Sequence, residues 1–189
     1  MKNDLQMRCL LFLVTTIGLL GSCQKDNPDK ATYVAYSLNG ASCNGAYRIE
    51  TDKDMSTLDA TAVVTPETET DPEVIFLTFY DYADEREVAF IIPRNQGNPY
   101  LLVHDSEFGM AVFHQTDGCV LTSGVENTVN GVSIEIKNFK HGKGVLGLGG
   151  SVAYMEGYFV GIMSYKNEMN EIEPHTVEGD FVYNENDVF

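Results

Sequence analysis

Short runs rich in β-branched and aromatic residues recur along the chain, with turn signals between them. The runs cover residues 32–38, 46–50, 61–64, 74–80, 87–92, 100–104, 110–114, 119–122, 132–137, 149–165 and 175–183. Residues 132–137 alternate apolar and polar side chains, as a strand with one buried face does. No window has the spacing of a long amphipathic helix. The pattern predicts a single all-β domain over residues 32–189, built as an antiparallel sandwich or barrel.

Turn signals between neighbouring runs predict hairpins. Residues 81–85 join the runs at 74–80 and 87–92, and a polar stretch joins 100–104 to 110–114, so both pairs are expected to be antiparallel neighbours. Near the N-terminus, Asn39-Gly40 and Asn44-Gly45 each suit a type I′ turn, and the sequence leaves the choice open. Residues 66–73 and 167–174 are acidic and are expected to form loops.

The first 23 residues follow the order of an export signal. Residues 9–20 are uncharged, follow Arg8, and are too few to cross a bilayer as a stable anchor. Leu20-Gly21-Ser22-Cys23 then supplies an aliphatic residue, two small residues and a cysteine. This motif resembles the lipobox of bacterial lipoproteins, which implies cleavage before Cys23 and attachment of lipid and palmitate-like acyl chains to it. Asp4 is unusual before such a run, so translation from Met7 is an alternative to Met1.

The residues after Cys23 suggest where in the cell envelope the protein is located. Gln24-Lys25-Asp26-Asn27 resembles the surface-export tag of Bacteroidota lipoproteins, and the closing run with Gly179 resembles that of small uncharacterised all-β lipoproteins of the same group. The resemblance implies a signal peptide at 1–22, a lipidated tether at 23–31, and an outer-membrane protein facing the cell surface. If the charges are only a solvated tether, the periplasmic face is the alternative.

The acidic net charge of the chain restricts the classes of partner that it is expected to bind. The chain has 12 Lys and Arg against 28 Asp and Glu, a net charge of −16, which disfavours nucleic acid. An extracellular glycan, a small ligand or a protein remains open, alongside the membrane reached through the lipid anchor. Residues 142–147 match G-x-G-x-x-G, but the strand-like residues after them predict no helix, so no cofactor is expected.

The cysteine count leaves one intramolecular pairing. Cys9 leaves with the signal and Cys23 is lipidated, so Cys43 and Cys119 are expected to form a disulfide outside the cytoplasm. The alternative is a thiol nucleophile with His104 or His114 as its base.

The remaining polar clusters suggest little chemistry. Asp81, Asp84 and Glu85 share one turn and are the candidate cation ligands, although they lack the EF-hand spacing. The four histidines show no metal-binding spacing, and no catalytic residue is assigned. We therefore expect a non-catalytic binding or structural role at the cell envelope. The alternatives are a β-barrel carrier of an apolar ligand and a hydrolase.

Overall fold

The computed structural model of the chain describes residues 30–51, 58–65, 67–94, 97–103, 108–123, 131–142 and 150–187. The lipobox, Cys23, the export tag, His104 and the glycines at 144 and 147 lie outside the described residues.

Every predicted run overlaps a strand. The strands are β1 (Tyr33–Asn39), β2 (Gly45–Glu50), β3 (Leu58–Thr65), β4 (Val74–Asp81), β5 (Arg86–Pro93), β6 (Tyr100–Val103), β7 (Gly109–His114), β8 (Cys119–Thr122), β9 (Gly131–His141), β10 (Gly150–Lys166) and β11 (Ile172–Asn184). A single 3₁₀ turn, η1 (Glu185–Asp187), completes the described part of the chain. The all-β prediction is confirmed. None of the described segments forms a helix with the length and apolar character needed to span a membrane.

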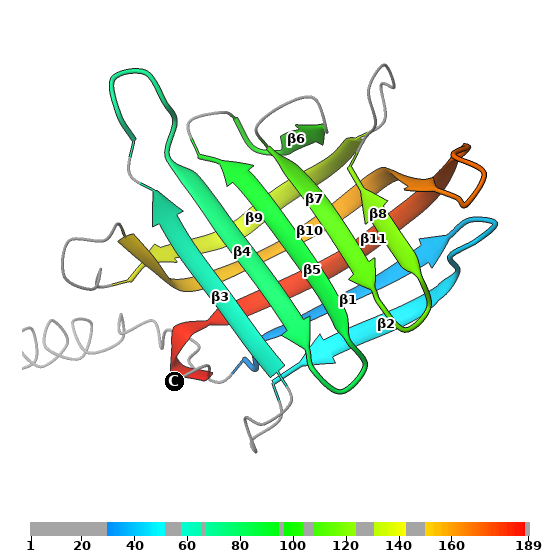
Figure 1. Cartoon of the computed structure of the whole chain (residues 1–189). Helices are drawn as coiled ribbons and strands as arrows, with labels where there is room; N and C mark the ends of the chain where they lie inside the picture. Colours follow the sequence, from blue (N-terminus) through cyan, green and yellow to red (C-terminus); the bar gives the residue numbers. More distant parts are fainter. Residues whose placement is uncertain are drawn as a thin grey trace, which may run out of the picture.

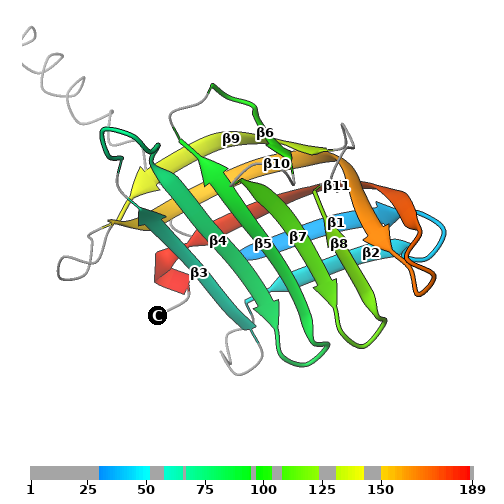
Figure 2. The ribbon, with the colours of Figure 1, turned by 45° about the horizontal axis from the view of Figure 1, so that its top comes forward.

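The strands form one antiparallel sheet that folds into two facing layers. The first layer has the order β2-β1-β11-β10-β9-β6, and the second has the order β3-β4-β5-β7-β8. In Figure 1 the second layer crosses in front of the first, and Figure 2 shows the same two layers after a 45° turn. β10 of the first layer pairs with both outer strands of the second layer. Gly150 near its start pairs with Val64 of β3, and Tyr165 near its end pairs with Leu121 of β8. The strands thus form two layers, and the path of pairings that leaves β10 through β3 returns to β10 through β8.

Aromatic side chains fill the space between the layers. The Phe90 ring of β5 lies 5.2 Å from Phe159 of β10 and 5.5 Å from Phe181 of β11, measured between centroids. Phe79 of β4 lies 6.4 Å from Phe181. All four rings are fully buried. This cluster joins the centres of the two layers through apolar contact.

Two glycines make room for these rings. Gly157 pairs with Phe181, and Gly179 pairs with Phe159, across the β10–β11 ladder. A Cβ atom at position 157 would lie 2.7 Å from the Phe181 ring, and one at 179 would lie 2.6 Å from the Phe159 ring. The absence of both side chains lets each ring lie directly over the backbone of the neighbouring strand.

The hairpin predictions divide into one success and one error. β4 and β5 pair as expected across residues 82–85. β6 and β7 do not pair: β7 lies between β5 and β8, whereas β6 joins β9 in the other layer. The reason is packing, because β6 places Leu102 opposite Val132 of β9, and both side chains are fully buried.

The N-terminal hairpin uses neither Asn-Gly pair as a two-residue turn. Residues 40–44 form its loop, so Asn39 ends β1 and Gly45 begins β2. This longer loop carries Cys43, and the length of the loop allows that cysteine to reach the second layer.

Candidate functional site

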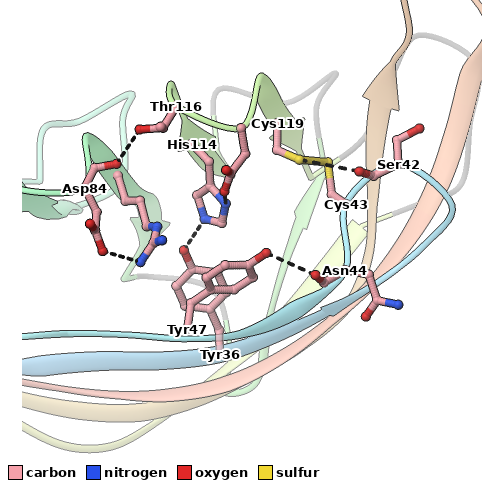
Figure 3. A network of polar contacts seen from close by, with 11 residues as sticks. Tyr36, Ser42, Cys43, Asn44, Tyr47, Asp84, His114, Thr116 and Cys119 are labelled. Atoms are coloured by element: carbon pink, nitrogen blue, oxygen red, sulfur yellow. Dashed lines mark hydrogen bonds and ion pairs between the residues drawn. A yellow bond between two sulfur atoms is a disulfide. The ribbon is translucent and has the colours of Figure 1, made fainter.

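A group of interacting polar side chains lies where one end of the first layer meets the second (Figure 3). We call it the cross-layer joint. It consists of the Cys43–Cys119 disulfide and the side chains of Tyr36, Tyr47, Arg86 and His114.

The disulfide is the covalent part of the joint. It links Cys43 of the β1–β2 loop to Cys119 at the start of β8, with Cα atoms 6.0 Å apart. Both cysteines are buried. The predicted disulfide is therefore present, and it fastens the first layer to the second. The alternative of a Cys43 or Cys119 nucleophile is wrong for this oxidised form, because neither sulfur is a thiolate.

A buried hydrogen bond lies beside the disulfide. The Tyr36 hydroxyl of β1 lies 2.5 Å from Nε2 of His114 of β7, and neither side chain is appreciably exposed. The Tyr47 ring meets the imidazole edge-on, with centroids 4.4 Å apart, and stacks against Tyr36 at 5.3 Å. The alternation of β1, β2 and β7 turns these three side chains inward, so they meet between the layers.

The environment keeps this pair neutral. Burial lowers the pKa of His114, the Arg86 charge lowers it further, and Asp117 opposes both. Burial also raises the pKa of the Tyr36 hydroxyl above its usual value. His114 Nδ1 has no hydrogen-bond partner but lies 3.8 Å from a carboxylate oxygen of Asp117. We therefore assign the proton to Nδ1, so that Nε2 accepts the hydrogen bond from Tyr36.

A second histidine supports the loop that carries Cys43. His175 Nε2 accepts the backbone N–H of Cys43 at 3.0 Å, while Nδ1 lies 3.2 Å from the Glu173 carbonyl. These two partners require the neutral ring with its proton on Nδ1. The ring lies so close to Gly40 that a Cβ atom there would approach it to 2.0 Å. The loop is thus held by β11 on one side and by β8 on the other.

The side of the loop facing solvent is held by a carboxylate. The Ser42 hydroxyl donates to Glu173 at 2.5 Å, and the Asn167 side chain donates to the same carboxylate at 3.1 Å. These bonds, Ser42 first, lower the pKa of Glu173. The β1–β2 loop and the β10–β11 turn therefore form one connected end of the first layer.

The candidate cation ligands Asp81 and Asp84 interact with neighbouring groups of the protein, and Glu85 contributes its backbone carbonyl. Asp81 accepts the backbone N–H groups of Ala83 and Asp84, at 2.9 and 3.3 Å. Asp84 pairs with Arg86 at 2.7 Å, and the Glu85 carbonyl accepts the N–H of Gln115 at 3.1 Å. Within the described residues, no group of three or more His, Cys, Asp or Glu side chains is arranged to hold a metal ion. The acidic turn shapes the β4–β5 connection rather than gathering its carboxylates.

Sequence reasoning found the disulfide and listed His114, but it missed Tyr36, Tyr47, Arg86 and His175 as parts of the same structure. A signal was present for Tyr36, which lies between Val34 and Leu38 at alternate, inward positions of β1. A tyrosine at such a position requires a buried hydrogen-bond partner for its hydroxyl. The identity of that partner depends on strand pairing, which the local sequence does not contain.

The interactions of the cross-layer joint therefore stabilise the contact between the two layers. Its sulfurs are bonded to each other, its imidazole and hydroxyl are buried and neutral, and the Arg86 side chain is paired with Asp84. Comparison with known proteins finds no matching family model, no matching curated protein and no matching solved structure.

Proposed function

We propose that the mature protein is a lipid-anchored outer-membrane protein with a non-catalytic binding or structural role at the cell envelope. The sequence of residues 8–27 supports the anchor and the export route. The main support for a non-catalytic role is that the side chains most suited to catalysis hold the two layers together. Cys43 and Cys119 form a disulfide between the layers, and His114 is hydrogen-bonded to Tyr36 of the other layer. Because the two layers are cross-linked, the domain is expected to be rigid, and a rigid domain can bind a partner through a preorganised surface.

The position of Lys30 indicates which end of the domain would face the membrane if Cys23 is lipidated. Asn184 donates to the carbonyl of Lys30, so Lys30 lies at the end of β11 where the strand finishes. Asn39 pairs with Thr176 at the opposite end of the same ladder. A lipid on Cys23 is separated from Lys30 by seven residue steps, a reach of at most about 25 Å. The Lys30 end would therefore face the membrane, and the β1–β2 loop and β10–β11 turn would face away from it.

The two alternatives have weaker support. A carrier of an apolar ligand needs internal space, whereas Phe79, Phe90, Phe159 and Phe181 meet in the centre of the domain. A hydrolase needs an activated nucleophile or converging carboxylates. The two described cysteines are oxidised, and Asp81 and Asp84 are occupied by backbone and arginine partners.

Fractionation of native-host cells tests the anchor. Replacing Cys23 by alanine is expected to move the protein from the membrane fraction to the soluble fraction, because the acyl chains have no other attachment point. The matched control is Cys9→Ala, which removes a cysteine from the signal segment and should leave the distribution unchanged. Retention of Cys23→Ala in the membrane would reject lipid anchoring through this residue.

Protease treatment of intact cells tests the orientation. Loss of the wild-type protein, with a periplasmic marker preserved, is the expected result for surface display. Survival until the outer membrane is broken would contradict it, provided the released protein is cleaved under the same conditions. The periplasmic alternative would then replace the surface assignment.

A further inference from the structure

The outward side chains of the second layer form a face with almost no charge, which we call the neutral face. Two acidic residues hold outward register positions on it, Asp59 of β3 and Glu87 of β5, whereas the whole chain carries 40 Asp, Glu, Lys and Arg residues. The other members are Thr61, Val63, Thr65, Val74, Phe76, Thr78, Tyr80, Ala89, Ile91, Gly109, Ala111, Phe113, Val120 and Thr122.

Strand register orders most of these residues into three rows that cross the strands, and Thr65 pairs with Val74 outside these rows. The middle row contains only small residues, namely Thr61, Thr78, Ala89, Ala111 and Thr122. One flanking row contains Val63, Phe76, Ile91 and Gly109. The other contains Asp59, Tyr80, Glu87, Phe113 and Val120. Small side chains thus run across the layer between two rows that carry aromatic rings.

Large apolar side chains of this face are open to solvent. Phe76 is 41% exposed, and Val63 and Val120 are each 46% exposed. The Tyr80 ring of the second flanking row meets the Tyr82 ring edge-on, with centroids 4.5 Å apart, and Tyr82 is also exposed. Apolar side chains gathered on one face of an otherwise acidic protein indicate an interaction surface.

Size and charge disfavour a second copy of the chain as the occupant. Five strands and three rows span about 20 Å by 20 Å, on the order of 400 Å², which is about half of what each partner buries in a stable interface. Two copies would also bring together two chains of net charge −16.

Backbone pairing and charge disfavour two other occupants. An extended peptide gains its main-chain hydrogen bonds at a sheet edge, whereas β4, β5 and β7 are each paired on both sides. A lipid surface would be expected to meet lysine and arginine side chains beside the apolar ones. The described residues of the neutral face include neither, so its chemistry fits an uncharged, hydroxyl-rich chain.

We propose that the neutral face binds a neutral carbohydrate chain lying across the strands, along the row of small residues. This proposal rests on the proposed binding role and names its ligand class. The apolar faces of the sugar rings would pack against Phe76 on one side and Tyr80 and Phe113 on the other. Sugar hydroxyls would exchange hydrogen bonds with the threonine hydroxyls of the middle row. The face is long enough across its five strands for several sugar units.

Calorimetric titration tests the proposal on the processed, lipidated protein held in lipid nanodiscs. The probes are cellohexaose, xylohexaose, mannohexaose and maltoheptaose, with polygalacturonate as the charged comparison. At least one neutral probe is expected to bind, and polygalacturonate is expected not to bind. Phe76→Ala removes an exposed ring, and Ala89→Lys places a long charged side chain in the middle row. Each is expected to weaken binding by about tenfold or more.

The matched control is Val160→Ala, because Val160 of β10 is 42% exposed on the outer face of the other layer. Its affinity should equal that of the wild type, and unchanged melting temperatures would show that all three variants fold. Equal losses in Val160→Ala and Phe76→Ala would overturn the assignment to the neutral face. So would the absence of binding by every neutral probe, or Phe76-dependent association between copies. None of these results changes the fractionation or protease outcome, so failure here is separable from failure of the proposed anchoring and display.

Discussion

Removing the Cys43–Cys119 disulfide should destabilise the domain strongly, because its two residues are far apart along the chain. They are separated by 76 positions. The chain-entropy relation gives about 4.5 kcal/mol for closing a loop of that length in the unfolded state at 25 °C. For a domain of this size, that loss corresponds to a fall in melting temperature of about 9–18 °C.

The assay is thermal unfolding of Cys43→Ala/Cys119→Ala and of the parent, each with and without reductant. Both proteins carry Cys23→Ser so that no other mature cysteine reacts. The parent should lose most of the difference when reduced, whereas the double variant should be insensitive to reductant. A double variant that melts within about 2 °C of the oxidised parent would refute the view that the disulfide stabilises the fold by closing this loop.

Two further perturbations test the packing and the electrostatics. Gly179→Ala should lower the free energy of unfolding by about 1–3 kcal/mol or more, because the added Cβ would lie 2.3 Å from the Ala35 carbonyl oxygen and would clash with the Phe159 ring. The control is Gly97→Ala, where no atom lies within 4 Å of the added Cβ. Its free energy of unfolding in denaturant should be nearly unchanged. The lowered pKa of His114 means that, as pH falls below about 6.5, the unfolded chain takes up a proton before the folded one does, so stability declines by at most about 1.4 kcal/mol per pH unit. His114→Gln should flatten that part of the pH profile, and an unchanged slope between wild type and variant would contradict the assigned role of His114.

The local sequence was sufficient for the strands because alternation and turn residues are local signals. Residues 74–80 and 87–92 predict β4 and β5 and their hairpin, since the strands are long and the connection is short. The same reasoning failed for β6, where a short connection suggested a hairpin with β7. The observed pairing of Leu102 with Val132 joins residues 30 positions apart, and no local pattern specifies that contact.

The joint was predictable in part for the same reason. A count of cysteines indicates the disulfide, but the meeting of Tyr36 with His114 requires knowing that β1 and β7 face each other from different layers. The local sequence also gives no sign of the role of Arg86, because a charged residue beside an acidic turn is typical of an exposed position. In the structure it pairs with Asp84 and lies 5.3 Å from the Tyr47 ring centroid, at the edge of the buried pair.

The uneven distribution of charge between the two outer faces connects solubility with the proposed binding surface. The first layer turns Arg48, Glu135, Glu156 and Asp180 outward, whereas the second turns outward mainly threonine, alanine and aromatic residues, with Asp59 and Glu87 as its acidic positions. A sheet face as apolar as the second would promote association if the rest of the surface were neutral. The net charge of −16 opposes that association by keeping copies apart. The acidic surface thus explains how the chain can keep Phe76 and its neighbours exposed and available for an uncharged ligand.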